Sequence, residues 1–258
     1  MPDTSSTPDP SPTPGGPAAR VLPDTEVDRA LVVMAHPDDV DFAAAGTIAT
    51  WTTAGIEVVY VICTDGQEGG FDDARPRTEI PRVRRAEQRA AAEKVRVRDV
   101  RFLGRMDGAL EPSRDLVRDL TALVREVRPD RALIQSPERI WDFLPRSHPD
   151  HLAAGEAAIR ALYPAAQNPY AFPELQADGL EAWKVREVWI AEHPTTNHVV
   201  DVTATFDAKL AALLCHESQH PAPETLEASV RAFLRANAAD AGLPEGRLAE
   251  VFAVHRLP

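Results

Sequence analysis

The sequence predicts a Rossmann-like α/β fold, in which a mainly parallel, twisted sheet carries helices on both faces. Two observations support this prediction. Short continuous apolar runs, typical of strands buried on both faces, alternate along the chain with segments of helical pattern. The length of 258 residues is sufficient for one sizeable α/β domain and does not require two.

The expected strands are apolar and rich in β-branched residues. The first is the run Ala-Leu-Val-Val-Met with the alanine that follows it, and the second reads Glu-Val-Val-Tyr-Val-Ile-Cys. In chain order the expected strands are Ala30–Ala35, Glu57–Cys63, Asp99–Leu103, Arg131–Gln135, Val185–Ala191 and Val199–Val202.

The expected helices separate these strands. The second has Arg and Glu on one face and Ala on the other, and the third must end before Pro129, since proline cannot continue a helix. In chain order the expected helices are Phe42–Ala54, Ile80–Val95, Arg114–Arg128, Pro149–Leu162 and Ala204–Glu217.

Composition distinguishes an N-terminal tail from the folded domain. The net charge and the apolar runs indicate which partners and locations are disfavoured. Residues 1–22 are rich in Pro, Ser, Thr, Asp and Gly, which predicts a disordered tail before a single domain over residues 23–258. The net charge of −12 disfavours nucleic acid and anionic membranes as partners. No apolar run approaches the roughly 20 residues that span a bilayer, and the N-terminus lacks the pattern of a signal peptide. We therefore expect a cytoplasmic protein.

Two clusters of acid–base and metal-binding groups stand at predicted strand-to-helix turns. The first, Ala35-His36-Pro37-Asp38-Asp39, follows the first strand, and the second is His148-Pro149-Asp150-His151. The loop Thr64-Asp65-Gly66-Gln67-Glu68-Gly69-Gly70 follows the second strand. Open α/β sheets bind ligands beyond the carboxyl ends of their strands, so these segments should converge on one edge of the sheet.

The first cluster has the composition of a catalytic metal site. Pro37 biases His36 toward an extended conformation, after which Asp39 can point at the same centre as the imidazole. A distant histidine would complete three ligands, and a catalytic zinc site keeps a further position open for water. Asp38, next to a ligand, is then the natural base, although Asp38 and Asp39 could instead only cap the next helix.

The second cluster supplies that distant histidine. Of His148 and His151, one can bind metal while the other faces a reacting carbonyl as an acid or oxyanion stabiliser. Asp150 can orient either ring through its second nitrogen. The ligand set suits Zn²⁺, although Fe²⁺ occupies similar ligands.

The paired motifs resemble the signatures of the LmbE-like family, also called the N-acetylglucosaminylphosphatidylinositol de-N-acetylase-like family. The resemblance spans roughly residues 29–252. Beyond the two clusters it includes Thr64-Asp65-Gly66, the Arg84…Glu87 helix, Leu103-Gly104…Asp107-Gly108, His216…Ser218-Gln219 and Ala249-Glu250…Phe252.

The family is similar to zinc amidases that remove acetyl groups from amino sugars or cleave related amides in thiol metabolism. The resemblance implies metal ligation by His36, Asp39 and His151, with Asp38 as the base and His148 as acid or electrostatic stabiliser. By position, Arg84 and Asp107 match residues that hold the sugar.

The chain also departs from the family pattern. Val40 and Asp41 stand where an acidic residue often follows the paired aspartates, so we expect Asp41 to serve as the outer acid. Ala45-Gly46 replaces a Gly-Gly pair, and Arg146 stands near a position where some members carry tyrosine. These departures affect substrate identity more than mechanism.

The leading hypothesis is a zinc-dependent deacetylase whose small-molecule substrate is an N-acetylated amino sugar or glycoside. The alternatives are an amidase for a larger thiol-conjugate amide and a non-catalytic metal-binding α/β module. A dinucleotide-dependent redox enzyme is opposed by the missing glycine fingerprint after the first strand. The sequence leaves the oligomeric state open, and a homo-oligomer is compatible with it.

Overall fold

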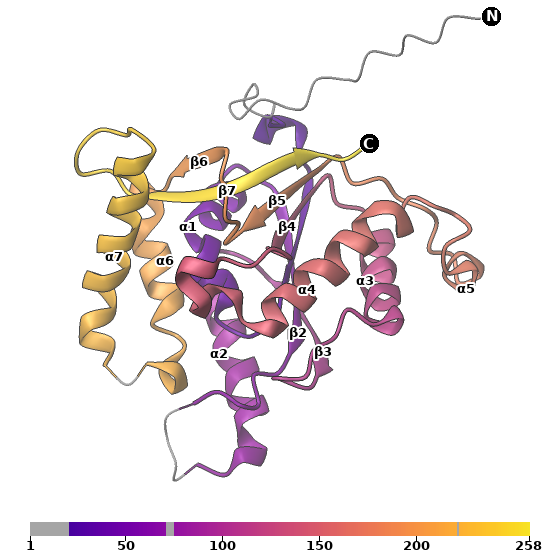
Figure 1. The fold of residues 1–258 in the computed structure, drawn as a ribbon, viewed down its shortest axis with the longest axis horizontal. Helices are drawn as coiled ribbons and strands as arrows, with labels where there is room; N and C mark the ends of the chain where they lie inside the picture. The colour runs from indigo at the N-terminus through magenta and orange to yellow at the C-terminus, as the bar shows by residue number, and fades with distance from the viewer. Residues whose placement is uncertain (1–20, 71–74, 221) are drawn as a thin grey trace, which may run out of the picture.

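The computed structural model describes residues 21–70, 75–220 and 222–258 and has the predicted α/β architecture (Figure 1). Its strands are β1 (Arg29–Met34), β2 (Glu57–Thr64), β3 (Asp99–Arg105), β4 (Arg131–Gln135), β5 (Glu187–Ala191), β6 (His198–Asp201) and β7 (Ala249–Arg256). Its α-helices are α1 (Asp39–Thr53), α2 (Ile80–Lys94), α3 (Arg114–Val127), α4 (Pro149–Arg160), α5 (Pro173–Ala177), α6 (Phe206–Leu213) and α7 (Pro223–Asp240).

The strands form one sheet in the order β3-β2-β1-β4-β5-β7-β6. From β3 to β5 every pair is parallel, whereas β7 runs antiparallel to both of its neighbours. The chain builds outward from β1 through β2 to β3 and then returns to place β4 on the other side of β1. This reversal creates a crevice between β1 and β4, where open α/β sheets bind their ligands.

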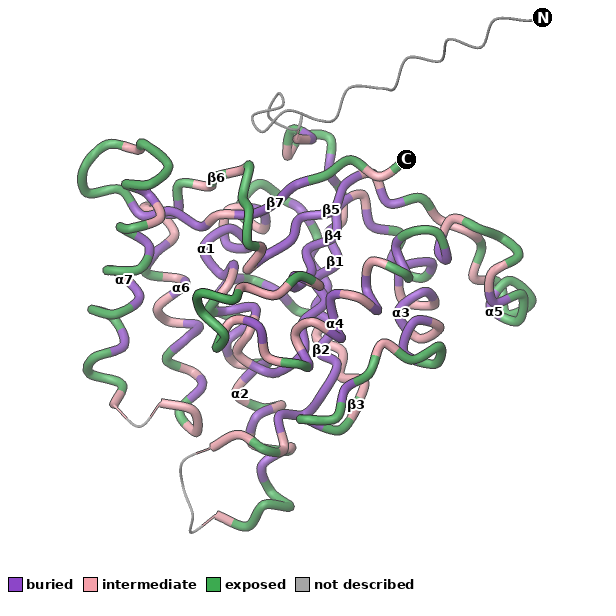
Figure 2. Tube along the Cα trace, viewed as in Figure 1, coloured by how far each residue is buried: buried purple, intermediate pink, exposed green. Residues whose placement is uncertain are grey.

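Two apolar layers enclose the sheet. One contains buried side chains of α1, α2 and α6, and the other contains those of α3 and α4. Figure 2 shows the central strands buried while the outer surface of α7 is exposed. Both faces of the central parallel strands β1, β2, β4 and β5 are covered, which explains the apolar runs in their sequences.

Helix α4 packs directly on the end of β4. A Cβ atom at Gly155 would lie only 2.4 Å from the carbonyl oxygen of Gln135, so only glycine allows this close approach. The contact fixes the first turn of α4 beside the carboxyl end of β4. His148 and His151 lie in that region.

Several parts of the sequence-based prediction differ from the structure. The helix expected at Ala204–Glu217 is shorter, since α6 spans Phe206–Leu213, and the short helix α5 was not predicted. Helix α1 begins three residues before the predicted start at Phe42, directly after Asp38. Helix α7 and strand β7 were not predicted; β7 joins β6 to the parallel part of the sheet, and α7 contacts β7.

The expected tail over residues 1–22 lies outside the described residues except for its last two. Leu22 is buried at 2% exposure, and its N–H donates to Glu187 Oε2 at 2.8 Å. Its carbonyl accepts a hydrogen bond from Arg131. Leu22 therefore packs on the folded domain. In the described part of the chain, no helix is both long and apolar enough to cross a membrane.

Candidate active site

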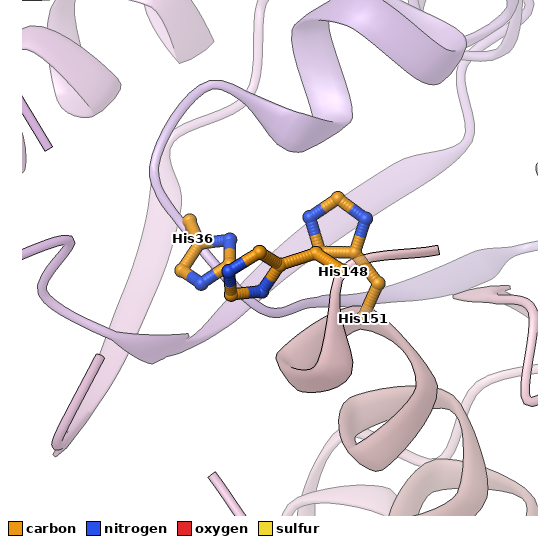
Figure 3. A group of neighbouring side chains, drawn as sticks. All are labelled: His36, His148 and His151. Atoms are coloured by element: carbon orange, nitrogen blue, oxygen red, sulfur yellow. The ribbon is translucent and has the colours of Figure 1, made fainter. Parts of the chain in front are cut away.

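The two predicted clusters meet at the crevice between β1 and β4. His36 lies on the loop after β1, and His148 and His151 lie at the start of α4, as Figure 3 shows. The centroid of the His36 ring lies 5.0 Å from that of the His148 ring and 5.2 Å from that of the His151 ring. The predicted convergence of the two clusters is confirmed.

Carboxylates surround the His36 imidazole. Its Nε2 lies 3.0 Å from Asp107 Oδ1 and 3.2 Å from Asp150 Oδ2, and its Nδ1 lies 3.4 Å from Asp39 Oδ2. Burial lowers the pKa of His36, but these carboxylates outweigh burial and raise it to about 12. The site therefore has an excess of negative charge that favours a cation.

Asp150 is held rigidly behind His36. Its Oδ2 accepts a hydrogen bond from the Gly108 N–H at 2.8 Å, and its Oδ1 accepts one from the Leu110 N–H at 3.2 Å. Asp150 is 1% exposed. The sequence suggested that Asp150 orients His148 or His151, whereas its carboxylate lies against the His36 ring.

Asp39 connects the first cluster, which contains His36, to the second cluster, which contains His151. Its Oδ2 accepts hydrogen bonds from the His36 backbone N–H and from Gln135 Nε2, and its Oδ1 lies 3.1 Å from His151 Nε2. The opposite nitrogen of His151, Nδ1, lies 3.5 Å from Glu192 Oε2. Burial lowers the pKa of His151, but Asp39 and Glu192 raise it to about 10.

This arrangement fits a divalent metal. The Asp39 carboxylate lies 3.4 Å from His36 Nδ1 and 3.1 Å from His151 Nε2, so these three residues provide the nitrogen and oxygen donors that zinc accepts. The far nitrogen of each histidine faces a carboxylate, as is usual for metal-ligating histidines. A ligand atom from each of His36, His148 and His151 also lies within 4.8 Å of the others, so the histidine cluster offers a second combination of donors.

His148 is fixed by its position at the start of α4. Its Nδ1 accepts a hydrogen bond from the Asp150 N–H at 3.2 Å. In the neutral ring the proton must then sit on Nε2, which can donate it. Burial lowers the pKa of His148, and the neighbouring His36 and His151 lower it further.

Asp38 has an unusual backbone conformation. Its φ of 92° lies in the left-handed region, which residues other than glycine rarely adopt. Its N–H donates to Gln88 Oε1 at 2.7 Å, and Arg84 donates to its carboxylate at 3.1 Å and to the Pro37 carbonyl at 2.6 Å. Burial raises the pKa of Asp38 to about 6, although the Arg84 charge opposes the shift.

Asp41 lies behind the Asp38 loop. Its Oδ2 accepts a hydrogen bond from Gln88 Nε2 and lies 2.8 Å from His216 Nε2, and all three side chains are buried. Asp41 therefore acts on the site through Gln88, which in turn holds the Asp38 backbone.

A polar hollow of about 390 Å³ opens over these groups. Arg84 and Asp107, the expected sugar-binding residues, lie on its wall. Arg84 also donates to the Gly66 carbonyl at 3.0 Å and so connects the hollow to the loop after β2. The hollow is lined by His36, Asp38, Glu68, Gly69, Arg84, Asp107, Pro145, His148 and His151.

Sequence reasoning missed three polar residues that hold the site. Gln135 and Glu192 contact Asp39 and His151, and each lies at the carboxyl end of a strand, β4 and β5. The rule that predicted the two clusters would also have found them. Gln88 lies within α2, and nothing in its helical context marks it out.

Comparison with known proteins agrees with this geometry. The model of the PIG-L family, described as GlcNAc-PI de-N-acetylase, matches residues 31–162, which include both clusters. The chain belongs to this family. The probable N-acetyl-α-D-glucosaminyl L-malate deacetylase 2 of Bacillus cereus is 36% identical over 196 residues, covering 73% of this chain and 82% of the relative.

Two diacetylchitobiose deacetylases extend the comparison. The enzyme of Thermococcus kodakarensis is 32% identical over 200 residues, covering 77% of this chain and 73% of the relative. The solved structure of the N,N′-diacetylchitobiose deacetylase from Pyrococcus horikoshii, bound to an inhibitor, aligns with a TM-score of 0.83 at 28% identity. That alignment covers 90% of this chain and 85% of the archaeal chain.

Proposed function

We propose that this protein is a metal-dependent hydrolase that removes the acetyl group from an N-acetylated amino sugar. The observation that carries the proposal is the Asp39 carboxylate in contact with both His36 and His151, with Asp38 and His148 lining the same hollow as the two histidines. Its relatives, named as deacetylases of N-acetylglucosamine derivatives, support the same reaction. Zinc as the metal and the cytoplasm as the location are parts of this proposal.

Each polar group of the hollow has a task in this reaction. His36, Asp39 and His151 would hold the metal, which would serve there as a Lewis acid that lowers the pKa of water and polarises a carbonyl. Asp38 accepts the proton of the attacking water and returns it to the leaving nitrogen. The Nε2–H of His148 stabilises the oxygen that becomes negative as the carbonyl carbon turns tetrahedral.

The substrate's sugar is held on the other side of the hollow. Asp107 can accept hydrogen bonds from sugar hydroxyls, and Arg84 can donate to them while it also positions Asp38. The Asp107 carboxylate is already fixed by the Glu68 N–H at 3.0 Å, so its orientation is set before substrate arrives.

The proposal is tested by loading the purified protein with Zn²⁺ and incubating it with methyl N-acetylglucosaminide and N,N′-diacetylchitobiose. We expect equal amounts of free amine and acetate, measured by an amine-reactive fluorophore and by acetate assay. Protein stripped of metal by a chelator is the control and should be inactive. Absence of amine from both compounds with fully loaded protein would contradict the proposal.

Gln88→Ala should lower kcat roughly tenfold while KM and metal content stay near the wild-type values. The variant removes the acceptor that holds the Asp38 N–H, and a small displacement of a catalytic group is costly. Thr121→Val is the matched control, since it removes another buried hydrogen bond of 2.7 Å on α3, away from the site. An equal fall in kcat for both variants would assign Gln88 a merely structural role.

A further inference from the structure

A large apolar cavity lies next to the polar hollow. Its volume is about 460 Å³, within the range of small-molecule sites. Helix α7, the start of α1, the β5–β6 connection and the short helical segment Trp141–Ser147 form its walls. It is lined by Phe42, Ala43, Phe143, Pro145, Arg146, Glu192, His193, Thr196, Leu226, Ser229, Val230, Phe233, Asn237, Glu250 and Val251.

The apolar walls of this cavity are open to solvent. Phe42, Phe143 and Phe233 are 41%, 52% and 38% exposed, which is a large exposed area for aromatic rings gathered in one place. The Arg146 guanidinium lies 4.3 Å from the Phe233 ring centroid and 5.4 Å from that of Phe143. It therefore connects α7 to the segment before His148 through cation–π contacts.

The cavity adjoins the candidate active site at two residues. Pro145 lines both the cavity and the polar hollow. Glu192 lines the cavity, and its carboxylate lies 3.5 Å from His151 Nδ1. The apolar space thus begins one side chain away from His151.

We propose that this cavity receives the hydrocarbon chain of an N-acyl group longer than acetyl, carried by the amino-sugar substrate. This inference rests on the hydrolase function proposed above. Water adds to the amide carbon and the C–N bond breaks, which yields a fatty acid carboxylate and the protonated amine of the sugar. The cavity holds the chain that leaves with the carboxylate.

Two groups of the substrate could enter the cavity: the acyl chain, or an apolar group on the sugar's anomeric oxygen. The positions of the residues around the hollow favour the acyl chain. Asp107 and Arg84 contact His36 and Asp38, at 3.0 and 3.1 Å, so a sugar held by them lies on that side. An amide whose nitrogen carries that sugar directs its acyl carbons to the opposite side, toward His151 and Glu192. The cavity opens there.

The experiment compares two substrate series with the zinc-loaded protein. One series is methyl glucosaminides carrying N-acetyl, N-butyryl, N-hexanoyl or N-octanoyl groups; the other is N-acetylglucosaminides with methyl, hexyl or octyl aglycones. We expect kcat/KM to rise about threefold per added acyl methylene until the cavity is filled, in line with the gain from burying each group. The aglycone series should change less than about threefold overall.

Filling the cavity with a large side chain should abolish the rise in kcat/KM with acyl length. Ser229→Trp places a large ring on the cavity wall from an exposed position on α7, where it leaves the core intact. We expect this variant to hydrolyse the octanoyl compound no faster than the acetyl compound. Ala228→Trp is the matched control, because Ala228 is exposed on the same helix and is absent from the cavity lining.

A binding measurement separates this inference from the proposed function. Calorimetry on the Asp38→Asn variant should show N-octanoyl-glucosamine binding at least about tenfold tighter than N-acetylglucosamine, with the difference lost on adding Ser229→Trp. Equal affinity for both compounds would overturn the inference. A gain confined to the aglycone series would also overturn it. Absence of amine release from every compound contradicts the proposed function, while the affinity ratio still decides this inference.

Discussion

Asp38→Asn should retain its metal and lose at least about 100-fold in turnover on any amide substrate, the effect typical of removing a general base. The substitution keeps the size and polarity of the side chain but removes its ability to accept a proton. Asn also tolerates the left-handed backbone of this position, where φ is 92°. The loss should therefore appear in kcat, while metal content by elemental analysis stays near the wild-type value.

Asp130→Asn is the matched control for this variant. Asp130 accepts hydrogen bonds from the N–H groups of Asp28 and Arg29, at the end of the sheet opposite the hollow. The same chemical change there should leave turnover intact. An Asp38→Asn protein with full metal and wild-type turnover would mean that another group accepts the proton.

The parallel core of the fold could be predicted because its strands carry an unambiguous pattern. The central residues of β1, β2, β4 and β5 are buried on both faces, and each of these strands carries an uninterrupted apolar run after its first, charged residue. Short strands between helices permit few other topologies than a parallel sheet. The same reasoning placed the ligand crevice at the carboxyl ends of the strands.

The last third of the chain carried weaker signals. In α7 the buried residues Leu226, Val230, Leu234 and Ala238 recur at four-residue spacing, a helical pattern that was present but not recognised. Strand β7 runs antiparallel to its neighbours. It is therefore not part of the alternation of strands and helices that predicted the parallel strands.

The candidate site was predictable where its residues cluster in the sequence. His36 and Asp39 are three positions apart, and His148 and His151 share the first turn of a helix, so local spacing alone brings each pair together. Gln88, Gln135 and Glu192 are single polar residues in separate elements, and their contacts with the site arise only from packing. Local spacing holds no information on such contacts.

His151→Ala should lose its metal and His148→Ala should keep it, which separates the donor set that contains Asp39 from the three-histidine set. If His36, Asp39 and His151 hold the metal, His151→Ala should reduce zinc from about one ion per chain to less than about a tenth of that, since one of three protein ligands is lost. His148→Ala should keep the ion and lose turnover, because its ring acts on the carbonyl oxygen. Elemental analysis after dialysis against metal-free buffer measures both.

His198→Ala serves as the control, since that imidazole packs on the Trp189 ring at 4.7 Å rather than in the hollow. Melting curves of all three variants show whether metal loss reflects unfolding instead of a missing ligand. Equal zinc loss in His148→Ala and His151→Ala would favour the three-histidine set, whose donor atoms also lie within 4.8 Å of one another. Full zinc occupancy in His151→Ala would exclude this residue from both sets. Asp39→Ala is a further test of the first set: Asp39 contacts both His36 and His151, so this variant should lose as much zinc as His151→Ala.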